Sequence, residues 1–207
     1  MRALLFSWEY PPRIVGKLAE YVSTLASQLV KNDVETHVIT YHDTMTGVAD
    51  EPNGAEVTRV TNPIRSLTNL LTWVLTLNQE VERVASNVYY ISGKHVDVID
   101  VHDWHFIPAA VTLKNALGIP IVYSVDSLED HRSPTADAPL NMAIRGIEWL
   151  GFYEAQEVTA KSEWMQSEII RLYKVPKEKI VVTLPVADIA VKNVLDIYKN
   201  VSGGNLG

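Results

Sequence analysis

Residues 96–125 read VDVIDVHDWHFIPAAVTLKNALGIPIVYSV, and this stretch decides the fold. Its two ends, 96–101 and 119–125, are apolar nearly throughout over the length of a strand. Runs of that kind predict strands that are buried on both faces. Residues 108–117 between them predict a helix, and Gly118 suits the position just after its end. Strand, helix and strand in this order predict a right-handed crossover in a parallel sheet.

The same alternation continues on both sides of this unit. Strands are predicted at 2–7, 35–41, 56–60, 157–160 and 179–184, and helices at 18–31, 66–92, 139–153 and 163–173. The polar stretches 42–54 and 127–138 are interpreted as loops. We therefore predict the α/β class, with a single Rossmann-like, doubly wound parallel sheet of about seven strands in the order 3-2-1-4-5-6-7.

The chain is predicted to form one domain with a short C-terminal addition. The Rossmann-like domain is placed at 1–185. Residues 186–201 have apolar side chains at helical spacing and are expected to form a C-terminal helix that packs back on the same domain. Residues 202–207, SGGNLG, are expected to form a flexible tail.

The composition is that of a globular protein and narrows the possible functions. The 207 residues carry 18 Lys+Arg against 25 Asp+Glu, a net charge of -7, which does not favour a nucleic-acid binder. Because cysteine is absent, disulfides, Cys-based zinc sites and cysteine nucleophiles are excluded. No apolar run reaches the ~20 residues of a membrane span, and the apolar N-terminal run is too short for a secretory signal. The sequence therefore predicts a cytoplasmic protein that binds no membrane.

Candidate functional residues follow the predicted strands at one edge of the sheet. In an open parallel sheet, ligands bind beyond the carboxyl ends of the strands. His102, Asp103 and Trp104 directly follow a strand there, and polar groups of this kind are costly to bury without a purpose. Asp103 can hold sugar hydroxyls, and Trp104 offers a flat apolar face. No GxGxxG, P-loop or GxSxG motif is present at the expected places.

Two of these features have structural alternatives. The turn at 14–20 opens a helix whose free N–H groups suit a phosphate, but Gly16 could simply permit a tight turn. Asp103 could cap the following helix while Trp104 packs on the sheet edge.

Two chemical alternatives also remain open. His102 and His105, together with Asp126 or His131, have the residue types of a zinc site. Lys161, at the end of a short strand, could form a Schiff base in an apolar pocket, or could extend to solvent.

Four segments together resemble the N-terminal half of a retaining GT-B glycosyltransferase, of the archaeal glycogen/starch synthase group. They are SWEYPPRIVGKLAE from Ser7, VIDVHDWHFIPAA from Val98, GIPIVYSVDSLE from Gly118, and EWLGFYEAQEVTAKSEWMQSEIIRLYKVPKEKIVV from Glu148. The resemblance covers residues 1–184. It implies half of a GT-B fold and transfer of a glucosyl group from a nucleotide sugar to an α-glucan, without a metal or other cofactor.

The resemblance also implies roles for single residues. In the family, this domain mainly holds the α-glucan or oligosaccharide acceptor, and a second Rossmann domain holds the nucleotide sugar. Gly16 and Lys17 would lie near the donor diphosphate, and Asp126 stands at the catalytic position of a family histidine that donates to the transferred sugar. Sugar- or acceptor-binding roles would fall to Glu9, Tyr10, His102, Asp103, Trp104 and Ser162.

Three residues depart from the family pattern. Lys17 stands where the family usually has a second glycine, and Lys161 where it has a small apolar residue. Asp126 replaces the histidine, and a carboxylate cannot donate a hydrogen bond while ionised and is expected to repel a diphosphate.

The end of the chain departs further. After KIVVTLP the family continues into the donor domain, whereas here residues 186–201 resemble the family's final helix. We expect a truncated or engineered acceptor-side domain without transferase turnover, to which a nucleotide sugar binds only if a donor domain is supplied.

The alternatives are a binding or assembly module and an active site redesigned around Lys17, Asp126 or Lys161. In the first of these, the former interdomain face is expected to be exposed and to form a homodimer. The aromatic residues expected on that face are Trp8, Tyr10, Trp104 and Phe106.

Overall fold

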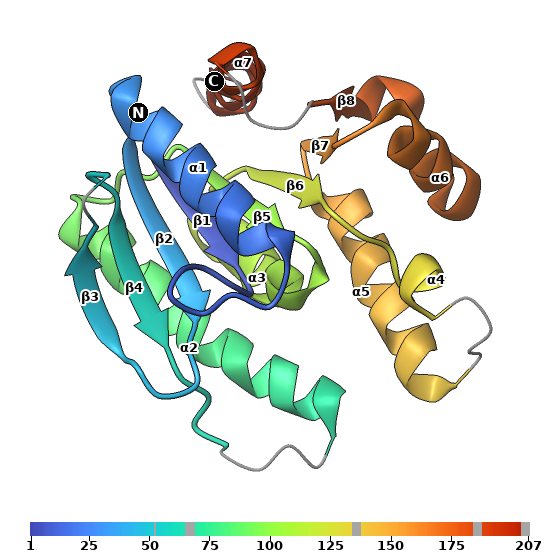
Figure 1. Cartoon of the computed structure of the whole chain (residues 1–207), viewed down its shortest axis with the longest axis horizontal. Coiled ribbons are helices and arrows are strands. Elements are labelled where there is room, and N and C mark those ends of the chain that lie inside the picture. Colours follow the sequence, from blue (N-terminus) through green and yellow to red (C-terminus); the bar gives the residue numbers. More distant parts are fainter. Residues whose placement is uncertain (52, 65–68, 134–137, 184–187, 204–207) are drawn as a thin grey trace.

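The computed structural model describes residues 1–51, 53–64, 69–133, 138–183 and 188–203 (Figure 1). The strands are β1 (Arg2–Ser7), β2 (Glu35–Tyr41), β3 (Gly47–Asp50), β4 (Glu56–Val60), β5 (Val98–His102), β6 (Ile121–Val125), β7 (Glu157–Ala160) and β8 (Ile180–Val182). The helices are α1 (Lys17–Lys31), α2 (Leu70–Ile91), α3 (Ile107–Leu117), α4 (Glu129–Arg132), α5 (Pro139–Glu154), α6 (Glu163–Tyr173) and α7 (Asp188–Gly203). Each predicted strand and helix is present.

The strands form one sheet in the order β3-β4-β2-β1-β5-β6-β7-β8. Every neighbouring pair is parallel except β3 and β4, which are antiparallel. With β3 set aside, this is the predicted order, so the doubly wound parallel sheet is confirmed.

The eighth strand, β3, corrects the predicted count of seven. It lies inside the stretch 42–54 that we interpreted as a loop, and it pairs with β4 at the edge of the sheet. The turn between the two strands is closed by a hydrogen bond from Glu51 N to Ala55 O, and Gly54 supplies a positive φ of 85°. Such a short edge strand is formed by pairing with its neighbour, because GVAD has no alternating pattern of its own.

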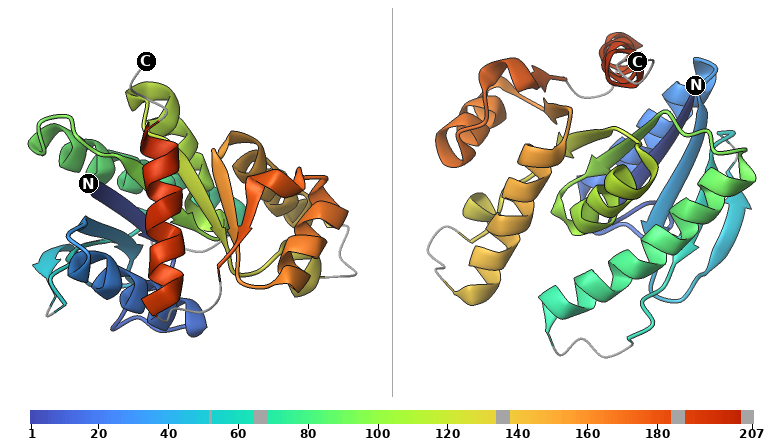
Figure 2. Two further views of the ribbon diagram at one scale, coloured as in Figure 1. Left: turned by 90° about the horizontal axis from the view of Figure 1, so that it is seen from above. Right: turned by 180° about the vertical axis from the view of Figure 1, so that it is seen from behind.

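Two layers of helices cover the sheet. One core packs α1 and α7 against one face, and the other packs α2, α3, α5 and α6 against the opposite face. Seen from behind, α2, α3 and α5 lie over the sheet, while α7 stands beside α1 on the far side (Figure 2). Among the described residues, no helix combines the length and the apolar character needed to cross a bilayer.

Two further segments differ from the prediction. Residues 129–132, expected to be part of a loop, form the short helix α4. Helix α7 continues to Gly203, two residues beyond its predicted end, so part of the expected tail is helical. Residues 204–207 lie outside the described residues, and so do residues 184–187 before the helix.

A buried carboxylate ties α7 to the sheet. Asp100, on β5, is almost fully buried and accepts a hydrogen bond of 2.6 Å from the hydroxyl of Tyr198 on α7. It accepts a second bond of 2.6 Å from Ser124 on the neighbouring strand β6. A charge at this depth is tolerated only when it is hydrogen-bonded, so the position of α7 depends on these contacts as well as on apolar packing.

We expect Tyr198→Phe to lower the free energy of unfolding by about 1–3 kcal/mol, because it removes a donor from a buried carboxylate. The measurement is urea denaturation followed by circular dichroism. Tyr90→Phe is the matched control: Tyr90 is 59% exposed and makes its contacts through its ring, so the effect should stay within about 0.5 kcal/mol. Equal stability of the two variants would contradict the proposed anchoring role of Asp100.

Candidate functional site

The candidate site lies along the edge of the sheet where the parallel strands end. We call this edge the rim; it comprises the residues that directly follow β1, β5, β6 and β7. The ends of these strands are in register, with Ser7 opposite His102, His102 opposite Ser124, and Val125 opposite Ala160. The segments that begin with Trp8, Asp103, Asp126 and Lys161 are therefore neighbours, as the topology predicts.

The β1–α1 turn is organised around its own carboxylate. Glu9 is buried, and its Oε2 accepts a hydrogen bond of 2.7 Å from Gly16 N and another from Val15 N. A Cβ on Gly16 would lie 3.3 Å from Glu9 Oε1, so the glycine permits this close approach. Glu9 places its negative charge at the start of α1, where it interacts favourably with the helix dipole.

This contact bears on the predicted phosphate site. A phosphate at the N–H groups of Val15 and Gly16 would have to displace the Glu9 carboxylate, since both bind the same donors. Lys17 is exposed at the same turn. The role of Gly16 and Lys17 near a diphosphate stays a prediction.

Asp103 holds two strand ends together. Its Oδ1 accepts hydrogen bonds from Asp126 N at 2.8 Å and Ser127 N at 3.1 Å, and its Oδ2 accepts one from Ser127 Oγ at 3.1 Å. The alternative that Asp103 caps the following helix is wrong, because its side chain makes no capping bond there. Burial raises the pKa of Asp103, and nearby Asp126 adds to the rise, while the two N–H bonds oppose it.

Four aromatic rings form a continuous stack along the rim. Trp8 stacks on Tyr41 with ring centroids 5.1 Å apart and on His105 at 4.3 Å, and His105 stacks on Trp104 at 4.3 Å. The guanidinium of Arg13 lies 5.0 Å from the Trp8 centroid and 4.7 Å from that of Tyr41. Such stacking stabilises the rings beyond the apolar area that they bury.

This stack corrects the expected exposed aromatic face. Tyr10 is 1% exposed, Trp104 4% and Phe106 0%, and Trp8 is only partly exposed. These side chains pack on one another and in the core instead of facing solvent. Exposed apolar side chains follow β1 and lie in the first turns of α5 and α6; they are Ile14, Val15, Leu140, Met142 and Trp164.

A cavity of about 340 Å³ opens beside Trp104. Its lining brings together the Asp103 and Trp104 segment, the 127–133 segment and the first residues of α5. The polar side chains in that lining are Asp103, Ser127, Glu129, Arg132, Ser133 and Asn141, with His105 in addition. Two of the residues predicted to bind sugar, Asp103 and Trp104, therefore line this cavity.

Arg132 is the centre of a hydrogen-bonded network in the cavity wall. Its Nη2 lies 2.8 Å from Oε1 of Glu148, its Nε lies 3.1 Å from Oε2 of Glu129, and its Nη1 donates to Ser127 Oγ. Tyr173 donates to the second oxygen of Glu148. Burial raises the pKa of Glu148, whereas the bonds from Tyr173 and Arg132 lower it.

Sequence reasoning missed Arg132 and Glu148. Arg132 lies in a stretch that we interpreted as a loop, and Glu148 lies in a helix without an obvious motif. One signal was available for Glu148: it falls on the apolar face of α5, between the buried positions Ile144 and Phe152.

The remaining predicted residues have mainly structural contacts. Ser162 caps α6 by accepting a hydrogen bond of 3.1 Å from Met165 N. Tyr10 is buried in the core beside α1. His102 is fully buried, with both ring nitrogens lacking a hydrogen-bond partner, and burial lowers its pKa. Asp126 forms an ion pair with Lys161, so two of the three residues that depart from the family pattern contact each other.

In the described part of the chain, His102 and His105 do not form a metal-binding group with Asp126 or with His131. There, no group of three or more His, Cys, Asp or Glu side chains could hold a metal ion. His131 instead contacts Glu168 on α6, with 3.0 Å between Nε2 and Oε2.

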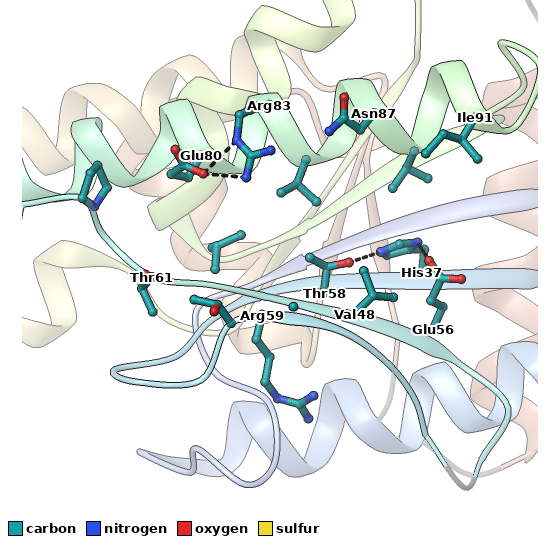
Figure 3. Close-up of a pocket in the computed structure, with 16 residues that line it drawn as sticks. His37, Val48, Glu56, Thr58, Arg59, Thr61, Glu80, Arg83, Asn87 and Ile91 are labelled. Carbon is teal, nitrogen blue, oxygen red and sulfur yellow. Dashed lines mark hydrogen bonds and ion pairs between the residues drawn. The ribbon is translucent and has the colours of Figure 1, made fainter.

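A larger groove of about 530 Å³ lies away from the rim, between α2 and the edge strands (Figure 3). His37 lines it and is held by Thr58 at 2.7 Å and Glu56 at 2.8 Å. Arg59 points to the opposite face of the sheet, where it binds Pro11 O and Glu51 (Figure 3). None of the residues predicted to bind sugar or phosphate lines this groove.

Comparison with known families decides the class of protein. Residues 18–190 match the family described as Glycosyltransferase Family 4. The chain belongs to this family. An uncharacterized glycosyltransferase of Methanocaldococcus jannaschii is 34% identical over 182 residues, covering 87% of this chain and 45% of that protein. A glycogen synthase of Mycobacterium tuberculosis is 25% identical over 187 residues, covering 84% and 45%.

Solved structures of similar fold include sucrose-phosphate synthase. Sucrose-phosphate synthase from Thermosynechococcus elongatus superposes with a TM-score of 0.70 at 14% identity, covering 88% of this chain and 47% of that one. A second structure of that protein superposes with a TM-score of 0.69 at 13% identity. The superposition covers 97% of this chain and 98% of that one. The family 4 chain thus spans about half the length of the curated relatives it matches. The resemblance to the N-terminal half of a GT-B glycosyltransferase is confirmed.

The burial of His105 in the ring stack makes the stability of this family 4 chain depend on pH. Burial lowers the pKa of His105 to about 3, and Arg132 and Arg13 act in the same direction. In the unfolded chain a histidine titrates near 6.5, so between about pH 6.5 and 3 only the unfolded state binds this proton. His105 therefore makes stability fall by about 1.4 kcal/mol for each unit of decreasing pH in that range.

We expect His105→Phe, which keeps an aromatic ring in the stack, to remove this contribution. Urea denaturation at several pH values between 7 and 4 should show a shallower loss of stability than in the original chain. His95→Gln, at an exposed histidine, is the control and should leave the slope nearly unchanged. An unchanged slope in His105→Phe would show that His105 is not neutral in the folded protein.

Proposed function

We propose that this family 4 chain is the acceptor-side lobe of a hexosyltransferase of the glycogen/starch synthase type. In this proposal the cavity beside Trp104 holds an α-glucan or oligosaccharide, and a nucleotide sugar is bound by a second lobe across the rim. The observation that carries the proposal is the convergence of Asp103, Trp104, Arg132 and Asn141 on one cavity at the carboxyl ends of the strands.

The chemistry of the cavity suits a neutral ligand that is rich in hydroxyl groups. Asp103 and Glu129 already accept hydrogen bonds from protein groups, Glu129 from both Arg132 and Asn141. Their remaining lone pairs can accept from hydroxyls, and the remaining N–H groups of Arg132 and Asn141 can donate to them. Because Arg132 lies between Glu129 and Glu148, its charge is already balanced. An anionic acceptor would therefore find no unpaired cation among the described residues that line this cavity.

The connection between β8 and α7 supports the assignment to a single lobe. Strand β8 ends at Val182 and α7 begins at Asp188, so only residues 183–187 separate them. Five residues leave no room for a donor-binding domain at this point. Transfer needs donor and acceptor in a fixed geometry, and such positioning can lower a barrier by about 7–11 kcal/mol. These 207 residues by themselves should therefore bind acceptor without transferase turnover.

The exposed apolar residues favour a partner at the rim. Ile14 and Val15 follow β1, Leu140 and Met142 lie in the first turn of α5, and Trp164 in the first turn of α6. Apolar side chains placed around a binding edge are typical of a face that docks another protein surface. A second lobe is our first candidate, and a second copy of the chain is the alternative, which light scattering distinguishes by mass.

We expect the chain to bind maltotriose and Asn141→Ala to weaken that binding by about 2- to 10-fold, the loss of one hydrogen bond. Isothermal titration calorimetry measures both affinities. Asn193→Ala, an exposed position on α7, is the matched control and should bind like the original chain. Saturable binding of a nucleotide-glucose at micromolar affinity, or no oligosaccharide binding at all, would contradict the acceptor-side assignment.

A further inference from the structure

The pair formed by Asp126 and Lys161 lies at the end of the rim, next to the cavity. Asp126 is the first residue after β6 and Lys161 the first after β7, and the preceding residues of these strands are opposite each other. Lys161 Nζ contacts Asp126 Oδ1. The pair adjoins the cavity because Asp126 is followed by Ser127, a lining residue, and both donate their N–H groups to Asp103.

Both members of the pair are held in position by neighbouring groups. Lys161 Nζ lies 3.7 Å from the centroid of the Tyr21 ring, a cation–π contact with α1. Burial raises the pKa of Tyr21, which keeps its hydroxyl protonated, and Thr183 is hydrogen-bonded to that hydroxyl. The backbone of Asp126 is fixed by Asp103. The two charged groups are therefore set before any ligand arrives.

The pair keeps unused hydrogen-bonding capacity. An ammonium has three N–H donors and a carboxylate has about four acceptor sites. Among the described residues, Asp126 Oδ1 is the acceptor that Lys161 reaches, and no other donor to the Asp126 side chain is found. The side chains of Lys161 and Asp126 are 22% and 31% exposed, so the free positions are open to a ligand.

Stability does not explain this arrangement. Partly exposed ion pairs stabilise proteins by only about 0–1 kcal/mol. Close to the pair, moreover, lies His102, which is fully buried and makes no hydrogen bond through either ring nitrogen. Its Nε2 lies 3.6 Å from Asp100 Oδ2, and it interacts electrostatically with Asp100 and then with Lys161 and Asp126. An unpartnered buried polar group destabilises the fold. A polar group retained at such a cost close to an open ion pair is typical of a functional site.

We propose that Asp126 and Lys161 together bind two adjacent hydroxyls of the acceptor sugar that projects from the cavity. Lys161 donates to one hydroxyl and Asp126 accepts from the other, so the pair is specific for a vicinal diol of a neutral sugar. This inference rests on the proposed function and adds the residues that set which hydroxyls lie at the point of transfer.

The pairing also changes the expectation for Asp126 alone. A lone carboxylate would repel a diphosphate brought by a second lobe, but the ammonium of Lys161 offsets that charge. Lys161 in turn is engaged as an ammonium, which has no free electron pair to form a Schiff base. The two residues are better explained as one neutral hydroxyl-binding unit than as separate charges.

The experiment measures maltotriose binding by calorimetry for Lys161→Met, Asp126→Asn and the double variant of the full chain. Each single variant should weaken binding about tenfold, the loss of a charge-assisted hydrogen bond. The double variant should be no weaker than the singles by more than about twofold, because the two groups act as a unit. Lys161→Arg, which keeps the charge and the donors, should restore part of the affinity.

Lys114→Met is the matched control. Lys114 forms a similar ion pair with Glu154, at 2.8 Å and with side chains 24% and 22% exposed, on another part of the surface. It should bind maltotriose like the original chain, and thermal melts should show that all variants remain folded.

Full affinity in folded Lys161→Met and Asp126→Asn would overturn this inference. If Asn141→Ala still weakens binding in the same series, the proposed acceptor site survives without the pair. If the original chain binds no oligosaccharide, the proposed function fails and this inference fails with it.

Discussion

The carboxylate of Asp103 is the interaction on which the candidate site depends. From the end of β5 it reaches the beginning of the next loop and accepts hydrogen bonds from Asp126 and Ser127. Its own backbone adopts a φ of 62°, a conformation that non-glycine residues rarely take and that the surrounding bonds must maintain. One side chain thus fixes both the cavity beside Trp104 and the ion pair next to it. A surface formed in advance in this way loses less entropy when a ligand binds.

Along the rim, charge is balanced locally. The pairs are Arg13 with Asp43, Lys161 with Asp126, and Arg132 with Glu129 and Glu148. Oppositely charged neighbours reduce the field that each would produce alone. What the rim offers to a ligand is therefore a set of directed donors and acceptors beside aromatic rings. Such a surface distinguishes ligands by the geometry of their hydroxyl groups more than by their net charge.

The sequence predicted the fold well and the site only in outline. Apolar runs such as VDVIDV identified the buried strands, because two-sided burial requires such composition. The four-residue strand β3 was not predicted, because its sequence has no strand pattern and the strand forms by pairing with β4. At the rim, the topology identified the right segments. It could not show which side chains would be buried or hydrogen-bonded within the protein and so be less available to a ligand. The bonds of Glu9 to the α1 turn and the burial of Trp104 in a ring stack depend on three-dimensional contacts between distant residues.

Helix α7 has a consequence for how the protein matures. Val194 and Ile197 complete the core that includes Val98 of β5 and Val122 of β6, and Tyr198 satisfies Asp100. Tyr198 follows Asp100 by 98 residues along the chain. While the chain emerges from the ribosome, this part of the sheet therefore remains uncovered until α7 has been made, with an apolar surface and a carboxylate that lacks one of its donors. Nascent chains of this kind are vulnerable to aggregation until the covering helix has packed on the sheet.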